Sequence, residues 1–217
     1  MEKLSEMLLR EGLAGRIVST AVLTSLLKGG DARRWGLVNR ALRAGELVRL
    51  KRGLYTIAPD IAGKSPELFT IANRIVPESY VSMESALGYH GWLQEEPIAV
   101  HSCIPRGRDN SFVNPFGRFV YKRVPFGENR FLLGVERHSS ERDPFLIAGP
   151  ERALADTLFA RKMEWKGINA LEAQLRIDPG LLGELDLDVM KEIATGSRSR
   201  SLGNYVSSLL FSLGGRT

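Results

Sequence analysis

The sequence predicts an α+β fold in two parts, and three observations lead to that expectation. Helical periodicity interrupted by glycines divides the first 44 residues into three short helices, and two β-branched, aromatic runs follow at residues 46–57. Beyond residue 98, strand-like runs alternate with turn-rich spans. Helical periodicity then returns from residue 151 almost to the end of the chain.

The composition is that of an ordinary globular protein, with 43% hydrophobic and 25% charged residues in a chain of 217. Charges interrupt the N-terminus every few residues, so no signal peptide is expected, and no run approaches the ~18 apolar residues of a membrane span. The single cysteine, Cys103, excludes an internal disulfide and a multi-cysteine metal site. We therefore expect a cytoplasmic protein with no membrane partner, no cofactor and no metal site.

The three N-terminal helices are expected to form a helix-turn-helix. The first covers residues 2–10, and Ser19 or Thr20 can cap the second, which ends at two consecutive glycines. Asp31 is the expected N-cap of the third helix, which runs to Ala44. A helix, a glycine turn and a second helix are the arrangement in which that second helix enters the major groove of DNA.

The third helix separates its side chains into two faces. At about 100° per residue, the side suited to packing carries Trp35, Val38 and Leu42, and Arg34 lies nearer to it. The opposite side carries Arg33, Gly36, Asn39, Arg40 and Arg43. Arginine can bind guanine or a phosphate with two parallel hydrogen bonds, and asparagine can pair with adenine, so this face is predicted to contact DNA.

The run from residue 46 to residue 57 predicts a β-hairpin, with its turn at Lys51, Arg52 and Gly53. A basic-tipped hairpin directly after a recognition helix is a wing. We expect Arg49, Lys51 and Arg52 to touch the DNA backbone or the minor groove. The N-terminal segment is therefore predicted to be a winged helix-turn-helix.

The net charge of +5 is located entirely in this segment. Residues 1–60 hold eleven Lys and Arg against six Asp and Glu, whereas residues 61–217 hold nineteen of each. This concentration of positive charge favours duplex DNA as the partner of the first segment. The alternative is a winged helix that makes protein contacts only.

Residues 58–66 are rich in Pro, Gly and Ser and predict a junction between a DNA-binding domain at 1–60 and a second domain at 64–217. We expect helices capped by Ser65 and by Ser82, the second ending at His90. Strands are expected at 98–104, 118–124, 131–137 and 145–147, and helices at 151–163, 168–175, 185–194 and 202–213. The second domain is thus predicted to be mixed α/β, with a small, largely antiparallel sheet and C-terminal helices.

No catalytic site is predicted in the second domain. The chain has no GxxxxGK[ST] phosphate loop, no GxGxxG after a strand and no HExxH, and its three histidines lack metal-ligand spacing. Cys103 and His101 are two apart on one strand, which is a weak indication of a nucleophile and its base. Arg152 and Asp156 are expected to form an intrahelical ion pair, and Ser82 and Glu84 to lie at the start of a helix.

Three blocks of the sequence resemble the AbiEi antitoxin family in content and order. They are LVRLKRGLY at 47–55, YVSMESALGYHG at 80–91 and IAGPERALAD at 147–156. The resemblance covers the first 156 residues, while the last helices match in general character only. The resemblance supplies no catalytic residue. Six residues of the blocks have no assigned role: Ser82, Glu84, His90, Glu151, Arg152 and Asp156.

The resemblance implies a type IV antitoxin of a bacterial abortive-infection system. The winged helix would bind the promoter of its own operon as an autorepressor. The second domain would counter a cognate nucleotidyltransferase-like toxin, with which it need not form a stable complex. Two alternatives remain: the second domain modifies the toxin enzymatically, in a kinase-like manner, or the protein is a stand-alone regulator without a toxin.

Overall fold

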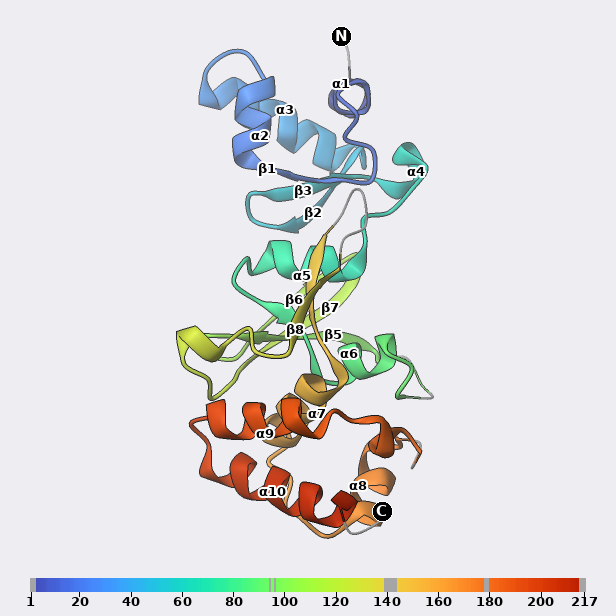
Figure 1. Ribbon diagram of the computed structural model, residues 1–217. Coiled ribbons are helices and arrows are strands. Elements are labelled where there is room, and N and C mark those ends of the chain that lie inside the picture. Colours follow the sequence, from blue (N-terminus) through green and yellow to red (C-terminus); the bar gives the residue numbers. More distant parts are fainter. Residues whose placement is uncertain (1–2, 94, 96, 139–143, 178–179, 215–217) are drawn as a thin grey trace.

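A computed structural model describes residues 3–93, 95, 97–138, 144–177 and 180–214. The chain forms an elongated stack with the N-terminal helices at one end, the larger sheet in the middle and the C-terminal helices at the other end (Figure 1). The protein is α+β, with a three-stranded and a six-stranded sheet. None of the helices within the described residues is long and apolar enough to cross a membrane.

The N-terminal segment has the topology of a winged helix-turn-helix. Its three helices are α1 (Leu4–Arg10), α2 (Thr20–Leu26) and α3 (Asp31–Arg43), and its antiparallel sheet, ordered β1-β3-β2, comprises β1 (Ile17–Ser19), β2 (Leu47–Lys51) and β3 (Leu54–Ile57). The Ser19 hydroxyl accepts a hydrogen bond from the Val22 amide at 3.3 Å, which confirms Ser19 as the cap of α2. Asp31 is the first residue of α3 and Gly30 its N-cap, one residue earlier than expected.

The small sheet belongs to two hydrophobic clusters. Leu47 and Tyr55 pack with the side chains of α1, α2 and α3, whereas Leu50 and Leu54 pack with the core of the second domain. A register shift between Arg49 and Lys51 accompanies this change of side. The hairpin β2–β3 is therefore a layer shared between the two cores rather than a free wing.

The six-stranded sheet has the order β6-β7-β5-β4-β9-β8. Its strands are β4 (Tyr80–Val81), β5 (Ala99–Ile104), β6 (Asn110–Asn114), β7 (Gly117–Arg123), β8 (Val135–His138) and β9 (Phe145–Ala148). The pairs β4–β9 and β5–β7 are parallel and the other three antiparallel, so the sheet is larger and more mixed than expected.

Two strand predictions need correction. The edge strand β6 was not predicted, because it lies between two turn-rich spans and only Phe112 and Val113 of its five residues favour a strand. The strand expected from Phe131 begins only at Val135, because the chain turns through Gly134, whose φ of 68° is unfavourable for other residues.

Helices cover the sheet and form the far end of the molecule (Figure 1). They are α5 (Leu68–Ile75), α6 (Met83–Tyr89), α7 (Pro150–Ala160), α8 (Ile168–Leu175), α9 (Leu187–Gly196) and α10 (Arg200–Gly214), with 3-10 turns η1 (Glu128–Arg130) and η2 (Leu181–Glu184). Helix α4 (Pro59–Ala62) lies instead beside the N-terminal segment, where Ala62 packs against the cluster of α1, α2 and α3 (Figure 1). The short helix α4 lies within the predicted junction at 58–66. Ser65 does not cap α5, because Pro66 is buried and the chain stays extended as far as Glu67.

Candidate functional site

The outward face of α3 carries the polar residues that periodicity predicts. Arg33, Asn39, Arg40 and Arg43 are exposed, while Val38 on the opposite side is buried. The buried stripe centres on Val38 and Ala41, so Trp35, which was expected on the packing side, lies at the edge of the stripe and is 44% exposed.

The arginines of this face keep their guanidinium groups available. Within the described part of the chain, Arg33, Arg40 and Arg43 form no ion pair. Arg34 differs from them, because its Nε donates to the Leu27 carbonyl at 2.9 Å and its Nη1 lies 3.1 Å from Asp31 Oδ1. Arg34 was expected nearer the packed side of α3, and its bond to the Leu27 carbonyl links α3 to the end of α2.

The hairpin tip is held by the rest of the protein. Lys51 Nζ donates to the carbonyl of Ile75 at the end of α5 (2.6 Å), and Asn114 Nδ2 donates to the Leu50 carbonyl (3.3 Å). On the other side, the Gly53 carbonyl accepts from the Thr20 amide at 2.9 Å. The structure thus gives Lys51 an intramolecular partner that the sequence did not reveal.

Arg49 and Arg52, in contrast, are exposed and form no ion pair among the described residues. The Arg49 guanidinium lies 6.0 Å from the centre of the Tyr55 ring, a long cation–π contact. Of the three basic residues expected at the wing, these two remain free for an external anion.

A polar cluster lies at the centre of the second domain and unites two of the family-like blocks. Asp156 is fully buried, and its carboxylate accepts hydrogen bonds from the Tyr80 hydroxyl (2.7 Å), the Ser82 hydroxyl (2.8 Å) and Arg152 Nε (3.0 Å). The i, i+4 ion pair predicted for Arg152 and Asp156 is confirmed, but both partners are completely buried. Ser82 stands at the N-cap of α6, yet its side chain makes no capping bond because it donates to Asp156.

The two terminal nitrogens of the Arg152 guanidinium also have hydrogen-bond partners. Nη1 donates to the Leu133 carbonyl at 2.7 Å, Nη2 donates to the Tyr80 hydroxyl, and the group stacks 3.7 Å from the centre of the Phe126 ring. A buried charge with a complete set of partners is a structural element. The cluster therefore organises the core around α7.

Cys103 belongs to this cluster and not to a Cys–His pair. Its Sγ lies 3.4 Å from an Asp156 oxygen, and burial raises the pKa of the thiol well above its usual range. Burial likewise raises the pKa of the Tyr80 phenol. Neither group is a nucleophile near neutral pH, because only the deprotonated forms attack and both are closed off from solvent.

Two further block residues make contacts between elements. His90 Nε2 lies 2.9 Å from the Ala148 carbonyl and so links the end of α6 to β9. Glu151 accepts from the Asp186 amide at 3.0 Å, at the N-cap of α9. Such contacts between elements support structural roles for both.

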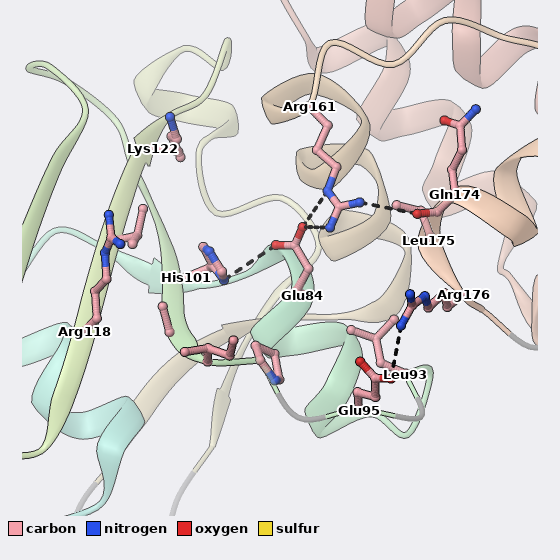
Figure 2. Close-up of a pocket in the computed structure, with 14 residues that line it drawn as sticks. Glu84, Leu93, Glu95, His101, Arg118, Lys122, Arg161, Gln174, Leu175 and Arg176 are labelled. Carbon is pink, nitrogen blue, oxygen red and sulfur yellow. Dashed lines mark hydrogen bonds and ion pairs between the residues drawn. The ribbon is translucent and has the colours of Figure 1, made fainter.

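Glu84 faces a cleft between the sheet and the α7–α8 region (Figure 2). The cleft has a volume of about 840 Å³, and its floor is formed by side chains of β5 and β7. Arg118 and Lys122 rise from β7 on one side, and Arg161 and Arg176 stand on the other (Figure 2).

The charges of the cleft are only partly paired. Arg161 binds Glu84 at 2.7 Å and Arg176 binds Glu95 at 3.0 Å, while Lys122 binds Asp109 at 2.8 Å. Arg118 forms no ion pair with any residue that the structure describes. Local sequence patterns do not reveal this set of charges, because its members come from strands and helices that are distant in the chain.

His101 lies on the floor of the cleft with its Nδ1 3.6 Å from Glu84. Burial lowers the pKa of His101, and the surrounding arginines and Lys122 act in the same direction, whereas Glu84 opposes them. The imidazole is therefore neutral at pH 7. In the part of the chain that the structure describes, no three His, Cys, Asp or Glu side chains are grouped to hold a metal ion.

The chain matches no protein-family model and no curated protein. Its fold is similar to that in the crystal structure of the Rv2827c protein from Mycobacterium tuberculosis, with a TM-score of 0.63 and 16% sequence identity. The match covers 98% of this chain and 76% of that one. At this identity the likeness shows the fold alone, a winged helix-turn-helix joined to an α+β domain, so the AbiEi resemblance stays a prediction.

Proposed function

We propose that the protein binds duplex DNA through α3 and acts as a repressor of its own operon. The observation that carries the proposal is the row of exposed arginines on the outward face of α3, which have no ion-pair partner among the described residues and lie in a segment that holds the whole positive excess of the chain. Guanidinium groups free of internal carboxylates can bind phosphates and guanine edges without first breaking an internal ion pair.

The position of α3 is compatible with this role. It is the second helix of the helix-turn-helix pair and lies at the end of the molecule remote from the C-terminal helices (Figure 1). In the proposed complex, Asn39, Arg40 and Arg43 face the major groove, and Arg33 lies near the start of the helix. Arg49 and Arg52 supply backbone contacts from the hairpin, without Lys51.

Titration of a labelled duplex from the region upstream of the gene tests the proposal by fluorescence anisotropy. We expect Arg40→Ala with Arg43→Ala to weaken binding about 30- to 20,000-fold, since each of the two lost contacts costs about 1–3 kcal/mol and every 1.4 kcal/mol is a factor of about ten. The matched control removes the same charge elsewhere, by replacing the exposed Arg108 and Arg130 of the second domain with Ala. Equal affinities for the two double variants would contradict the proposal.

We further propose that the second domain is an antitoxin that counters a nucleotidyltransferase-like toxin. This part rests on the three sequence blocks that resemble the AbiEi family. The α7 block supplies the core ion pair, and the block at 80–91 supplies Ser82 to the same cluster. The two blocks thus contribute to one buried cluster, which is compatible with their belonging to a single domain of the AbiEi type.

Co-expression with the product of the adjacent gene tests the antitoxin role. The Arg40→Ala, Arg43→Ala variant should still rescue growth, because repression and neutralisation reside in different domains. Intact-mass measurement of the toxin then separates two modes of action. An unmodified toxin indicates neutralisation without covalent change, and a mass-shifted toxin indicates an enzymatic second domain. The absence of a toxin-like neighbour, or of any rescue, would favour a stand-alone regulator.

A further inference from the structure

The cleft below Glu84 concentrates positive charge in a domain whose sequence is neutral overall. Residues 61–217 hold equal numbers of acidic and basic residues, yet four cations and two carboxylates line this cleft. Figure 2 shows the cations on two opposing sides. A ligand between them would meet positive charge from both directions.

The cations differ in how easily they can bind a ligand. Arg118 needs no rearrangement, because it has no carboxylate partner among the described residues and is exposed. Lys122 and Asp109 form a surface pair with side chains 39% and 53% exposed, and such pairs contribute little to stability. Arg161 is oriented by the less exposed Glu84, which binds its Nε and Nη2, and its Nη1 donates to the Gln174 carbonyl at 3.5 Å. Only the second hydrogens of Nη1 and Nη2 are left for a second anion.

Apolar side chains also line the cleft. Ala99 and Val120 come from β5 and β7, as does the largely neutral His101, which has a hydrogen-bonding ring without adding charge, and Leu175 comes from α8 on the side of Arg161 (Figure 2). A volume of about 840 Å³ lies within the range of small-molecule sites, which combine an apolar lining with a few polar groups.

We propose that this cleft binds a small phosphorylated ligand of the nucleoside phosphate class. The phosphates lie between Arg118, Lys122 and Arg161, and the ring system rests on Val120 and Leu175. Several adjacent negative charges match cations on two sides, and arginine binds phosphate oxygens in a bidentate manner. The chain has no glycine-rich phosphate loop, so side chains rather than backbone amides hold the phosphates. The inference is independent of the proposed function.

Isothermal titration calorimetry of the full chain with ATP, in EDTA, tests this inference. We expect saturable one-site binding that weakens about 10- to 100-fold in Arg118→Ala, since hydrogen bonds to charged groups are strong. Lys122→Ala should weaken it less. Arg108→Ala is the matched control, because it removes an exposed arginine outside the cleft.

Three outcomes would overturn the assignment. One is the absence of binding at millimolar ATP. Another is an affinity that Arg118→Ala leaves unchanged but Arg40→Ala with Arg43→Ala abolishes, which would place the nucleotide on α3. The third is equal affinity for tripolyphosphate and ATP, which would show that the nucleoside ring makes no favourable contact with Val120 and Leu175. Thermal unfolding of Arg118→Ala checks that this exposed substitution leaves the fold intact.

Discussion

Arginine occurs in two contrasting settings in this protein. On α3 the guanidinium groups of Arg33, Arg40 and Arg43 are exposed and have no carboxylate partner among the described residues. In the second domain Arg152 is completely buried, and Asp156, Tyr80, a backbone carbonyl and the Phe126 ring satisfy it. The same side chain is thus available for an external anion in one region and fixed as part of the core in the other.

The difference follows from solvation. Removing a guanidinium and a carboxylate from water is costly, and only well-placed hydrogen bonds and their mutual attraction offset the loss. An exposed arginine has no such requirement and binds whichever anion approaches. Burial and partners, rather than the type of residue, therefore decide whether a charge is structural or functional.

The largest expected effect comes from breaking the buried pair. Asp156→Ala leaves Arg152 charged in the core and should lower the free energy of unfolding by about 3–5 kcal/mol. Urea denaturation followed by circular dichroism measures it. Glu78→Ala, which removes one of two exposed carboxylate partners of Arg106, is the control and should cost less than about 1 kcal/mol. A cost below 1 kcal/mol for Asp156→Ala would show that the cluster is dispensable.

The salt dependence of DNA binding tests the exposed arginines of α3. If Arg40 and Arg43 contact phosphates, replacing both with Ala should reduce the slope of log K against log salt by about 0.9 for each lost contact. Asn39→Ala should instead reduce the preference for the specific duplex and leave the slope unchanged. An unaltered slope in the arginine variant would place these two side chains on base edges only.

At the hairpin tip, a basic residue with an internal partner, Lys51, is next to an exposed one, Arg52. Lys51→Ala should lower the free energy of unfolding by about 1–2 kcal/mol, because it removes a charged donor from the Ile75 carbonyl, with little effect on DNA binding. Arg52→Ala should do the reverse. Denaturant titration and anisotropy on both variants measure the two effects. If Lys51→Ala weakened DNA binding instead, the hairpin tip would have to leave α5 when DNA binds.

His101 gives the smallest expected effect. Because burial lowers its pKa in the folded protein, the unfolded chain binds the proton more readily as pH falls through the ordinary value of about 6.5. The native state therefore loses stability below that pH. His101→Gln should show a smaller fall in Tm between pH 7.5 and 5.5 than the wild type. An equal fall would assign the acid sensitivity to other groups.

Local sequence patterns predicted much of the helical structure. The glycine stops, the Ser19 cap and the 3.6-residue period located α1, α2 and α3 within a few residues, and the exposure of Arg40 and Arg43 followed from the same period. Helix α8 has the bounds that were expected. These features depend on neighbours within one or two turns, which the sequence displays directly.

Long-range contacts could not be obtained in this way. The i, i+4 spacing predicted that Arg152 pairs with Asp156, but not that Ser82, 74 residues away, joins them in the core. Strand β6 has weak intrinsic preference and is defined by its pairing with β7. The cleft, likewise, exists only because β7, α7 and α8 converge.

The sequence by itself determined which face of α3 is basic and which segment holds the positive charge. Helical periodicity fixes the direction of a side chain relative to its own helix, and composition fixes its charge. Only the tertiary structure decided which charges have partners. It buried Arg152, attached Lys51 to α5 and left Arg33, Arg40 and Arg43 of α3 exposed, because pairing and solvation depend on how elements distant in sequence pack together.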